Sequence, residues 1–577
     1  MAKQKENRMA KREVRDQLFR DYWHSVFLKA MGFCEKEIAS TRIAVVNSWS
    51  EQSPGHIHLR DLGDAVKAGI RLAGAMPFEI NVLGPCSGLA ENEHYVSYYD
   101  LPQREVILNS IETAINVGYC QGWVGLCTCD KIVPAMLIAA MRLNKPCLIV
   151  TGGPMIPGKY DNDWLAIGKG FTIAYPKFKA GTLKQKELQA MTCAAGYCVG
   201  SCAEMTTGNS MQIMAESLGM TIPGTSMIPA AVAYKKMMAK EAGMQIVKLA
   251  REKITPSKIV TEEAMRNAIA VDMAVGGGTN SLLHLQALAW EARKKINLDT
   301  WAEYGRKIPT ICAIAPNGPY SLIDFHEAGG VPAVMNEIKH HLHLNVMTVS
   351  GKKLKENIKD ARSLNRDVIR PLSHPLSPEG SIAILRGNLA PRGAVIRHTV
   401  VGNKKLLNMD YKAKVFDSYE DALDAIFTDT PKSIRAGDVI VCRYEGPRGG
   451  PAMAEILMVI HSLIAAGKKD IAVITDGRFS GLTRDYPAIG HVCPEAQVGG
   501  PIAIVKDGDI IRLDLSKRRL DLKVDEKEIK KRFEGWKPVE KKVSGILSVY
   551  RKLALQADQG AGWETTAWES DERKREV

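Results

Sequence analysis

The sequence has little of several features that define other classes of protein. Aromatic residues make up 6% of the 577 residues, and the chain carries 12 cysteines. No window holds ~18 uninterrupted apolar residues, so we predict no transmembrane helix. Residues 1–32 lack the apolar stretch of a secretory signal, and there is no internal repeat. Cysteines spread thinly through a long chain are unlike a secreted disulfide scaffold, which predicts a reducing, cytoplasmic location.

Charge of neither sign forms an unbroken block. The net charge is +13, and basic residues concentrate near the N-terminus and in residues 517–542, with acids interleaved in both places. Interleaved charge favours a solvated surface over a nucleic-acid-binding face. A basic protein attracts small anions, so we expect a small acidic molecule as the partner, without nucleic acid or membrane.

The abundant residues indicate a globular α/β protein. Apolar residues are 45% and charged residues 24% of the chain, which also has 49 glycines, and such a balance suits many tight turns. In the first two-thirds, apolar spacing predicts strands at 43–49, 124–127 and 147–151 and helices at 62–73, 104–117 and 134–143. Repeated strand–helix–strand units predict a doubly wound parallel sheet with helices on both faces.

The composition and the predicted secondary structure of the sequence change near residue 370. Pro371, Pro375 and Pro378 break helices and predict a linker. We therefore predict an N-terminal α/β/α domain over residues 1–370 and a β-rich domain over residues 371–577. The second domain has predicted strands at 381–385, 393–398, 438–442, 502–505 and 510–515, and a predicted helix at 454–466. The polar tail after residue 556 is expected to be loose.

Two cysteines, an aspartate and a lysine directly follow a predicted strand. They stand in the segment Cys127-Thr128-Cys129-Asp130-Lys131-Ile132-Val133-Pro134. Ligands of α/β sheets bind at the carboxyl ends of strands, and thiolates suit iron whereas carboxylates suit Mg²⁺. The alternative, of equal weight, is that Cys127 and Cys129 are small buried residues and that Asp130 caps the helix.

A further cysteine, Cys202, lies in residues 200–211, which also open a predicted helix. A helix N-terminus lowers the pKa of a thiol and favours metal ligation. One alternative is a zinc site built from Cys193, Cys198 and Cys202, although the spacing is not that of a zinc finger. Another is that all three are buried cysteines.

Residues 54–58 bring two histidines close in sequence, and residues 84–88 bring Cys86. His56 and His58 are candidate metal ligands. Strand-like alternation allows equally that one of them is buried and hydrogen-bonded.

Two segments of the C-terminal half carry candidate catalytic side chains. Ser480 follows the apolar run 471–474 within Ile-Thr-Asp-Gly-Arg-Phe-Ser-Gly, the position of a nucleophile or base at a strand end. Because Arg478 replaces the first glycine, this is not the G-x-S-x-G elbow, and an ordinary turn serine is the alternative. The glycines of residues 444–453 allow backbone N–H groups to approach an anion. Glu455 beyond them is either a metal ligand or an acid that complements a helix dipole.

Taken together and in this order, the segments resemble the IlvD/Edd dehydratase family over nearly the whole chain. The resemblance is carried by CDKIVP (129–134), VTGGPM (150–155), GSC-x-x-M (200–205), GGGTNSLLHL (276–285), HEAGGVPAVM (326–335), SPEGSIAILRGNLAPRGAV (377–395), YEGPRGGPAM (444–453), ITDGRFSG (474–481) and GHVCPEA (490–496).

The resemblance implies a hydro-lyase that dehydrates a 2,3-dihydroxy carboxylate to a 2-oxo acid. It also implies an N-terminal α/β domain, a C-terminal β-barrel-like (swivelling) domain, and a homodimer or homotetramer. Within the family we expect the branched-chain substrates of valine and isoleucine biosynthesis. An aldonic-acid dehydratase and a non-catalytic, cluster-binding relative are the alternatives.

The cofactors that the resemblance implies are an iron–sulfur cluster, 2Fe–2S or 4Fe–4S, and Mg²⁺. Matched position by position, the cluster ligands are Cys86, Cys129 and Cys202. The Mg²⁺ ligands are Asp130, Lys131 as a carbamate, and Glu455, and the base is Ser480. An unmodified ammonium has no lone pair, so carbamylation is chemically required for a ligating lysine.

The sequence departs from the family pattern near Cys86. The aspartate expected after that cysteine, usually a Mg²⁺ ligand, is Ser87 here. We expect that Glu91 or Glu93 takes over its role, or that the metal site is altered. Ala135 and Ala452 replace usual glycines, which predicts a narrower space near the metals.

Overall fold

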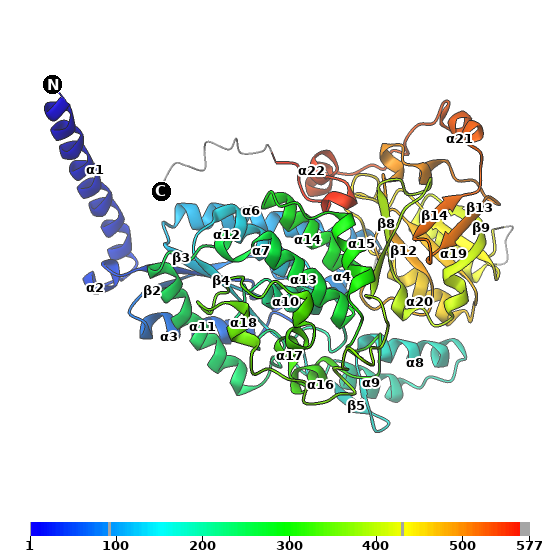
Figure 1. Ribbon diagram of the computed structural model, residues 1–577, viewed down its shortest axis with the longest axis horizontal. Helices are drawn as coiled ribbons and strands as arrows, with labels where there is room; N and C mark the ends of the chain where they lie inside the picture. The colour runs from blue at the N-terminus through cyan, green and yellow to red at the C-terminus, as the bar shows by residue number, and fades with distance from the viewer. Residues whose placement is uncertain (1, 91–93, 429–431, 566–577) are drawn as a thin grey trace.

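The computed structural model describes residues 2–90, 94–428 and 432–565. A helical body built on a parallel sheet lies beside a second body that is rich in strands, and a long N-terminal helix projects from the first (Figure 1). The mixed α/β class predicted from the sequence is confirmed.

The first sheet has the strand order β2-β1-β3-β4, and its strands run parallel. The strands are β1 (Arg42–Asn47), β2 (Met76–Asn81), β3 (Gly122–Cys127) and β4 (Cys147–Thr151). Every residue of β3 and β4 is buried. Continuous apolar runs of this kind are typical of parallel strands that are covered on both faces.

Two pairs of helices cover this sheet. The helices are α3 (Leu59–Leu72) with α11 (Ala233–Arg251), and α6 (Pro102–Val117) with α7 (Ile132–Leu143). In Figure 1 the first pair lies below the strands and the second pair above them. The predicted doubly wound arrangement is thereby confirmed, and the predicted strands and helices lie within a few residues of the observed ones.

Buried helices continue the first body beside α7. Most residues of α10 (Thr207–Ser217), α13 (Glu262–Val275) and α14 (Thr279–Glu291) are buried. A helix that is buried all round belongs to the core of a large domain. The N-termini of α10 and α14 both face the candidate site described below.

The second body is an eight-stranded sheet of order β14-β13-β9-β10-β11-β12-β8-β7. Its strands are β7 (Ile382–Leu385), β8 (Gly393–Arg397), β9 (Asn408–Phe416), β10 (Asp438–Cys442), β11 (Ala472–Thr475), β12 (Ala488–Cys493), β13 (Ile510–Asp514) and β14 (Arg519–Leu522). A bridge between Arg386 and Arg519 links its two outer strands, so the sheet is nearly closed. This confirms the barrel-like architecture, whereas the domain boundary at residue 370 stays a prediction.

Other helices and short strands complete the fold. In the first body they are α1 (Ala2–Ala30), α2 (Glu35–Ile38), α4 (Ser87–Ala90), α5 (His94–Ser97), β5 (Gly158–Tyr160), β6 (Asp163–Leu165), α8 (Ile167–Lys179), α9 (Gln185–Ala195), α12 (Pro256–Ile259), α15 (Leu298–Lys307), α16 (Leu322–Glu327), α17 (Gly330–Glu337), η1 (Lys339–His341) and α18 (Leu354–Ile358). In the second they are η2 (His398–Val400), η3 (Lys404–Leu407), α19 (Tyr419–Phe427), α20 (Leu457–Ala465), η4 (Ala496–Val498), η5 (Pro501–Ile504), α21 (Glu526–Phe533), α22 (Gly545–Leu553) and η6 (Ala557–Gln559).

Two local predictions for the second body are wrong. Residues 501–504 form the 3-10 helix η5, because Pro501 lacks the N–H that a central strand needs. Residues 556–565 are not loose: the Gly560 carbonyl accepts a hydrogen bond from Arg104, and Ala561 is fully buried. The rest of the predicted tail, 566–577, lies outside the described residues.

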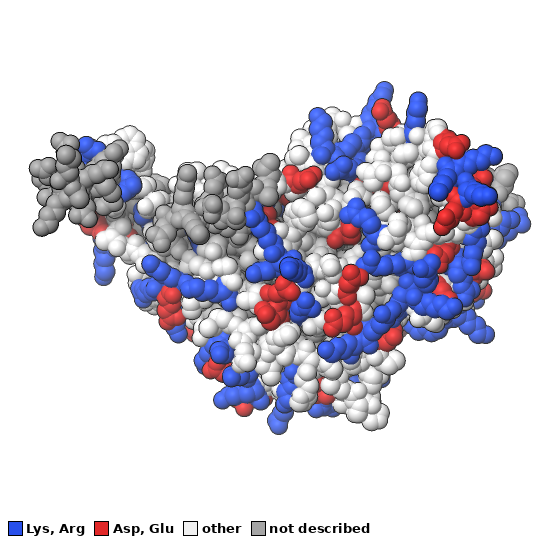
Figure 2. All heavy atoms as spheres, turned by 45° about the horizontal axis from the view of Figure 1, so that its top comes forward, with Lys and Arg blue, Asp and Glu red and all other residues white. Residues whose placement is uncertain are grey.

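In the described part of the chain, no helix combines the length and the apolar character that a membrane crossing requires. On the face shown in Figure 2, acidic side chains lie between the basic ones.

Candidate active site

Lys131 lies at the centre of a buried group of carboxylates. It follows β3 immediately before α7, and its side chain is 0% exposed. The Nζ atom lies 2.8 Å from an oxygen of Asp100, 3.4 Å from Asp130 and 3.9 Å from Glu455. The structure thus brings together the three residues that the resemblance implies as Mg²⁺ ligands, and it adds Asp100.

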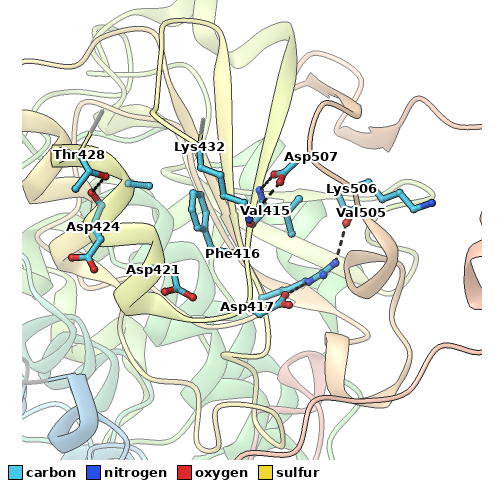
Figure 3. A pocket seen from close by; sticks show the side chains of 12 residues that line it. Val415, Phe416, Asp417, Asp421, Asp424, Thr428, Lys432, Val505, Lys506 and Asp507 are labelled. Atoms are coloured by element: carbon cyan, nitrogen blue, oxygen red, sulfur yellow. Dashed lines mark hydrogen bonds and ion pairs between the residues drawn. The ribbon is translucent and has the colours of Figure 1, made fainter. Parts of the chain in front are cut away.

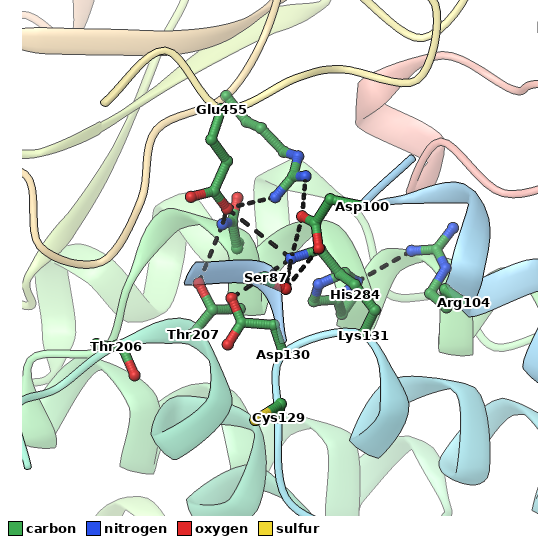
Figure 4. Close-up of polar contacts among 12 residues, drawn as sticks. Ser87, Asp100, Arg104, Cys129, Asp130, Lys131, Thr206, Thr207, His284 and Glu455 are labelled. Carbon is green, nitrogen blue, oxygen red and sulfur yellow. Dashed lines mark hydrogen bonds and ion pairs between the residues drawn. The ribbon is translucent and has the colours of Figure 1, made fainter. Parts of the chain in front are cut away.

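Arg478 joins the two bodies at this group, because it pairs with Asp100 of the first and Glu455 of the second, both labelled in Figure 4. Its guanidinium is fully buried and forms ion pairs with Asp100 and Glu455. Glu455 also accepts a hydrogen bond from Asn280 at the start of α14 over 2.6 Å. The site is therefore built from both halves of the chain.

Asp100 is a functional candidate that the sequence analysis missed. It stands just before α6, and one of its oxygens accepts hydrogen bonds from Ser87 at 2.5 Å and Gln103 at 2.9 Å. Glu91 and Glu93, the expected replacements for the missing aspartate, lie outside the described residues. An acid next to a helix start is so common at surfaces that its local pattern gave no signal.

The charges of the group decide its protonation. Burial opposes the charged form of Asp100, but Lys131 and Arg478 outweigh it and hold the pKa of this carboxyl below its usual value. Burial raises the pKa of Asp130. Burial and Arg478 oppose the ammonium of Lys131, and its pKa is nevertheless raised by the three neighbouring carboxylates. The lysine is held here as a cation by acids that surround it.

Three thiols lie next to the carboxylates. The Cys86 sulfur and the Cys129 thiol are hydrogen-bonded to each other, which lowers the pKa of Cys86 to about 7 and raises that of Cys129. Cys202 is near enough to raise the pKa of Cys129 further by charge repulsion. Cys86, Cys129 and Cys202 therefore come from distant parts of the sequence to one place.

The histidines near the thiols hold the backbone. His56 accepts a hydrogen bond from the Cys129 amide at Nε2 over 3.1 Å, and its Nδ1 lies 2.7 Å from the Ser48 carbonyl. His58 Nε2 donates to the Gly152 carbonyl over 3.1 Å. Burial lowers the pKa of both to about 4. The interpretation of His56 as buried and hydrogen-bonded is the one that the geometry supports.

The alternative zinc site is not formed. Cys193 is exposed, and the Cys198 sulfur accepts a hydrogen bond from the Ile156 amide over 3.1 Å. Over residues 2–90, 94–428 and 432–565, no three His, Cys, Asp or Glu side chains are arranged to hold a single metal ion.

The donors nevertheless fit the two groups that the resemblance implies. The irons of a cluster are separate atoms, so three thiols need not converge on one point. A Cβ on Gly55 would lie 2.5 Å from the Cys129 sulfur, so the absence of a side chain there leaves space beside the thiols. The oxygen-rich group around Lys131 has the chemistry that Mg²⁺ prefers, and the lysine ammonium lies among the carboxylates that an ion would contact.

Several buried polar atoms at the site have no hydrogen-bond partner. They are His284 Nε2, Asn280 Oδ1 and both ring nitrogens of His491. Arg104 donates to His284 Nδ1 over 3.0 Å, so the proton of the neutral ring is on Nε2. A buried donor or acceptor without a partner costs about 1–3 kcal/mol, and such atoms at a candidate site are typical of groups that await a ligand. Asn280, His284 and His491 lie in segments that carry the family resemblance. The sequence analysis gave them no role, because their neighbours at the site are distant in the sequence.

Ser480 lies in the loop between β11 and β12 of the second body, and this loop contacts the first body. A Cβ on the next residue, Gly481, would lie 2.8 Å from the Cα of Thr206, so this loop packs against the N-terminus of α10. Thr206 belongs to the short segment between Cys202 and α10. Ala135 and Ala452 are both fully buried, and Ala452 packs with Leu101 behind Asp100.

A separate cavity of about 690 Å³ lies on the second sheet between β9, α19 and the loop before β13 (Figure 3). It is lined by acids and bases that pair with each other, such as Arg443 with Asp417. None of the predicted site residues lines it.

Comparisons with known proteins find a single family. Residues 41–357 match the family model described as dihydroxy-acid/6-phosphogluconate dehydratase N-terminal, and residues 367–561 match the C-terminal model of the same family. The chain is similar to proteins named dihydroxy-acid dehydratase. One from Pyrococcus furiosus is 45% identical over 93% of this chain and 97% of the relative. One from Caldicellulosiruptor saccharolyticus is 48% identical over 92% of this chain and 96% of the relative.

Proposed function

The chain belongs to the dihydroxy-acid/6-phosphogluconate dehydratase family, and from this premise we propose that it dehydrates 2,3-dihydroxy-3-methylbutanoate and its ethyl homologue to 2-oxo acids. These reactions belong to valine and isoleucine biosynthesis. The observation that supports the proposal is the buried acid–lysine–arginine group, completed by residues of both bodies and adjacent to three thiols.

We also propose the cofactors. Cys86, Cys129 and Cys202 would hold the iron–sulfur cluster, and Asp130, Glu455 and a carbamylated Lys131 would hold Mg²⁺. When bound, these groups supply Lewis acidity, which polarises the C3 hydroxyl as a leaving group and stabilises negative charge beside the substrate carboxylate.

Ser480 is the proposed base. Removal of the weakly acidic C2 proton needs a strong base, and a serine alkoxide meets that need. The C2–H electrons form the C2–C3 double bond as the C3 hydroxyl departs, takes up a proton and becomes water. The enol that remains tautomerises to the 2-oxo acid.

His284 is a proposed substrate donor. Burial and the nearby cations lower the pKa of His284, so the ring is neutral. With Arg104 on Nδ1, the Nε2–H is the group free to donate to a substrate oxygen. Arg104 thereby fixes the tautomer of the ring.

The test is a substrate panel with anaerobically purified protein. We expect a 2-oxo acid from the branched dihydroxy acids, and a loss of at least ~100-fold in turnover for Ser480→Ala with unchanged iron content. Ser516→Ala, which alters a surface serine bonded to Asn408, is the control. Full turnover by Ser480→Ala would remove the base assignment.

The same panel decides between the alternatives. Preference for aldonic acids over the branched substrates would identify a sugar-acid dehydratase, an alternative motivated by Ser87 in place of aspartate. No product from any dihydroxy acid, with iron and sulfide present, would identify a non-catalytic relative.

The proposal extends to the setting of the enzyme. We place it in a reducing cytoplasm, because three thiolates must stay unoxidised to bind iron. We also propose a homo-oligomer, homodimer or homotetramer.

A further inference from the structure

The carboxylate of Asp100 is held in one orientation, with one oxygen directed at Lys131 and Arg478. The side chain is 4% exposed. One oxygen faces Lys131 and Arg478, and the other accepts from Ser87 and Gln103. Two hydrogen-bond donors therefore fix its orientation, and its charge faces the centre of the group.

Independent atoms at the same place also await a ligand. His284 Nε2 and Asn280 Oδ1 are buried without a hydrogen-bond partner, and both side chains are 0% exposed. Figure 4 shows His284 beside Lys131, on the side of the ring opposite Arg104. The carboxylates around Lys131 therefore border a candidate ligand site and are more than a structural ion pair.

The charges of the group suit a divalent cation. Three carboxylates, Asp100, Asp130 and Glu455, face two cations, Lys131 and Arg478, which leaves one net negative charge. Carbamylation joins Nζ to the carbon of CO₂ and releases two protons from the ammonium, so the lysine changes from one positive to one negative charge. A bound divalent cation adds two positive charges and returns the group to one net negative charge.

Asp100 supplies one of the negative charges in this sum. Without it, two carboxylates, the carbamate and Arg478 would carry a net charge of −2 around a divalent cation instead of −3, which weakens the attraction for the cation. The hydroxyl of Ser87 is neutral, so it adds no charge to the group, and it donates a hydrogen bond to the Asp100 carboxylate over 2.5 Å.

We propose that Asp100, oriented by Ser87, supplies the third carboxylate of the divalent-cation site formed with Asp130, Glu455 and carbamylated Lys131. This inference rests on the proposed function. Residues 87 and 100 then act as a pair: Asp100 supplies the carboxylate, and Ser87 holds it in place.

The experiment measures the binding of Mn²⁺, as a paramagnetic probe of the cation site, to the bicarbonate-treated, cluster-loaded protein by electron paramagnetic resonance. For Asp100→Asn we expect the apparent Kd for Mn²⁺ to rise at least about tenfold, with iron and sulfide contents unchanged. Glu216→Gln is the matched control, because Glu216 is a buried carboxylate outside the Lys131 group, with hydrogen bonds from Gly224 and Ser226.

A double exchange keeps the test decisive if the single variant unfolds. Ser87→Asp combined with Asp100→Ser returns one carboxylate to the pair from the other position, and we expect it to recover most of the Mn²⁺ affinity that Asp100→Ser loses. A thermal melt of each variant checks folding.

The outcomes separate the two proposals. Mn²⁺ affinity unchanged in Asp100→Asn would overturn the ligand assignment even if the wild type dehydrates its substrate. Recovery in the double exchange supports the assignment even if no tested dihydroxy acid is consumed, which would count against the proposed function alone.

Discussion

Gly55 leaves room for the Cys129 thiol because it has no side chain. A Cβ there would lie 2.5 Å from the sulfur of Cys129, closer than two such atoms can approach. We expect Gly55→Ala to displace the Cys129 thiol and to lower the iron and sulfide content of anaerobically purified protein while the fold persists. Gly402→Ala is the control, because a Cβ at Gly402 meets its nearest atom at 3.7 Å. Wild-type iron content in Gly55→Ala would contradict the cluster site.

Burial brings the pKa of Lys235 into a range where its effect on stability can be measured. Burial lowers its pKa from 10.5 to about 7. Between these values the unfolded state binds a proton that the folded state lacks, so the free energy of unfolding rises with pH. The contribution is at most about 1.4 kcal/mol per pH unit.

The adjacent lysine supplies the control for this pH dependence. We expect Lys235→Met to remove the rise between about pH 7 and 10.5, measured by urea denaturation, because no buried amine is left. Lys236 pairs with Asp61 at the surface, and Lys236→Met should keep the rise. Equal pH profiles for the two variants would show that Lys235 does not titrate as proposed.

Single residues were predictable where a motif is contiguous. Cys129, Asp130 and Lys131 are adjacent at the end of a strand, a place where ligands gather, and the sequence therefore identified them as candidates. Asp100 and His284 were missed because their importance comes from partners far away in the sequence, Arg478 and Arg104 among them.

The helices α3 and α11 cross at two glycines. A Cβ on Gly69 would lie 2.0 Å from the carbonyl oxygen of Lys240, and one on Gly243 would lie 2.2 Å from that of Val66. We expect Gly69→Ala to push the helices apart and to lower the free energy of unfolding by about 1–3 kcal/mol.

Helical propensity alone gives the opposite expectation. Alanine is favoured over glycine by about 0.5–1 kcal/mol in a helix interior, and Gly170→Ala in α8, where the nearest atom is 3.6 Å away, should show that gain. Thermal and urea denaturation of the two variants compare them. A higher free energy of unfolding for both Gly69→Ala and Gly170→Ala would mean that α3 and α11 move apart without loss of stability.

Elements were predictable where burial is uniform or strictly amphipathic. The strands β1, β3 and β4 are apolar runs, and α6 carries Ile107, Ile111 and Ile115 on one face. The edge strand β2 was missed because its Pro and Glu obscure the pattern. The η5 segment was taken for a strand because its isoleucines are buried, whatever the backbone conformation.

At the scale of the whole molecule, neither body contains a complete site. Asp100, Asp130 and Lys131 come from the first, whereas Glu455, Arg478 and Ser480 come from the second. The change in composition indicated two domains, and the family resemblance implied Mg²⁺ ligands from both, but no local pattern indicated which surfaces of the two bodies are in contact. Residues near Gly481 and Thr206 carry that contact.

The N-terminal helix α1 offers a surface for assembly. It projects from the body in Figure 1, and its exposed apolar residues recur every four positions in two adjacent rows. They are Leu18, Phe19, Tyr22, Trp23, Val26 and Phe27, from 46% to 66% exposed. An apolar stripe of this length is costly in water, and a two-fold contact between copies would cover the same stripe on both chains.

We therefore expect light scattering to give the mass of an oligomer for the wild type and a smaller mass for Trp23→Glu combined with Phe27→Glu. Buried charge in the stripe opposes association, whereas Leu364→Glu, at an exposed leucine outside α1, should leave the mass unchanged. The active site lies away from α1, so the double variant should also keep its iron content. An unchanged mass would assign the oligomer contact to another surface, and a monomeric wild type would remove the proposed assembly altogether.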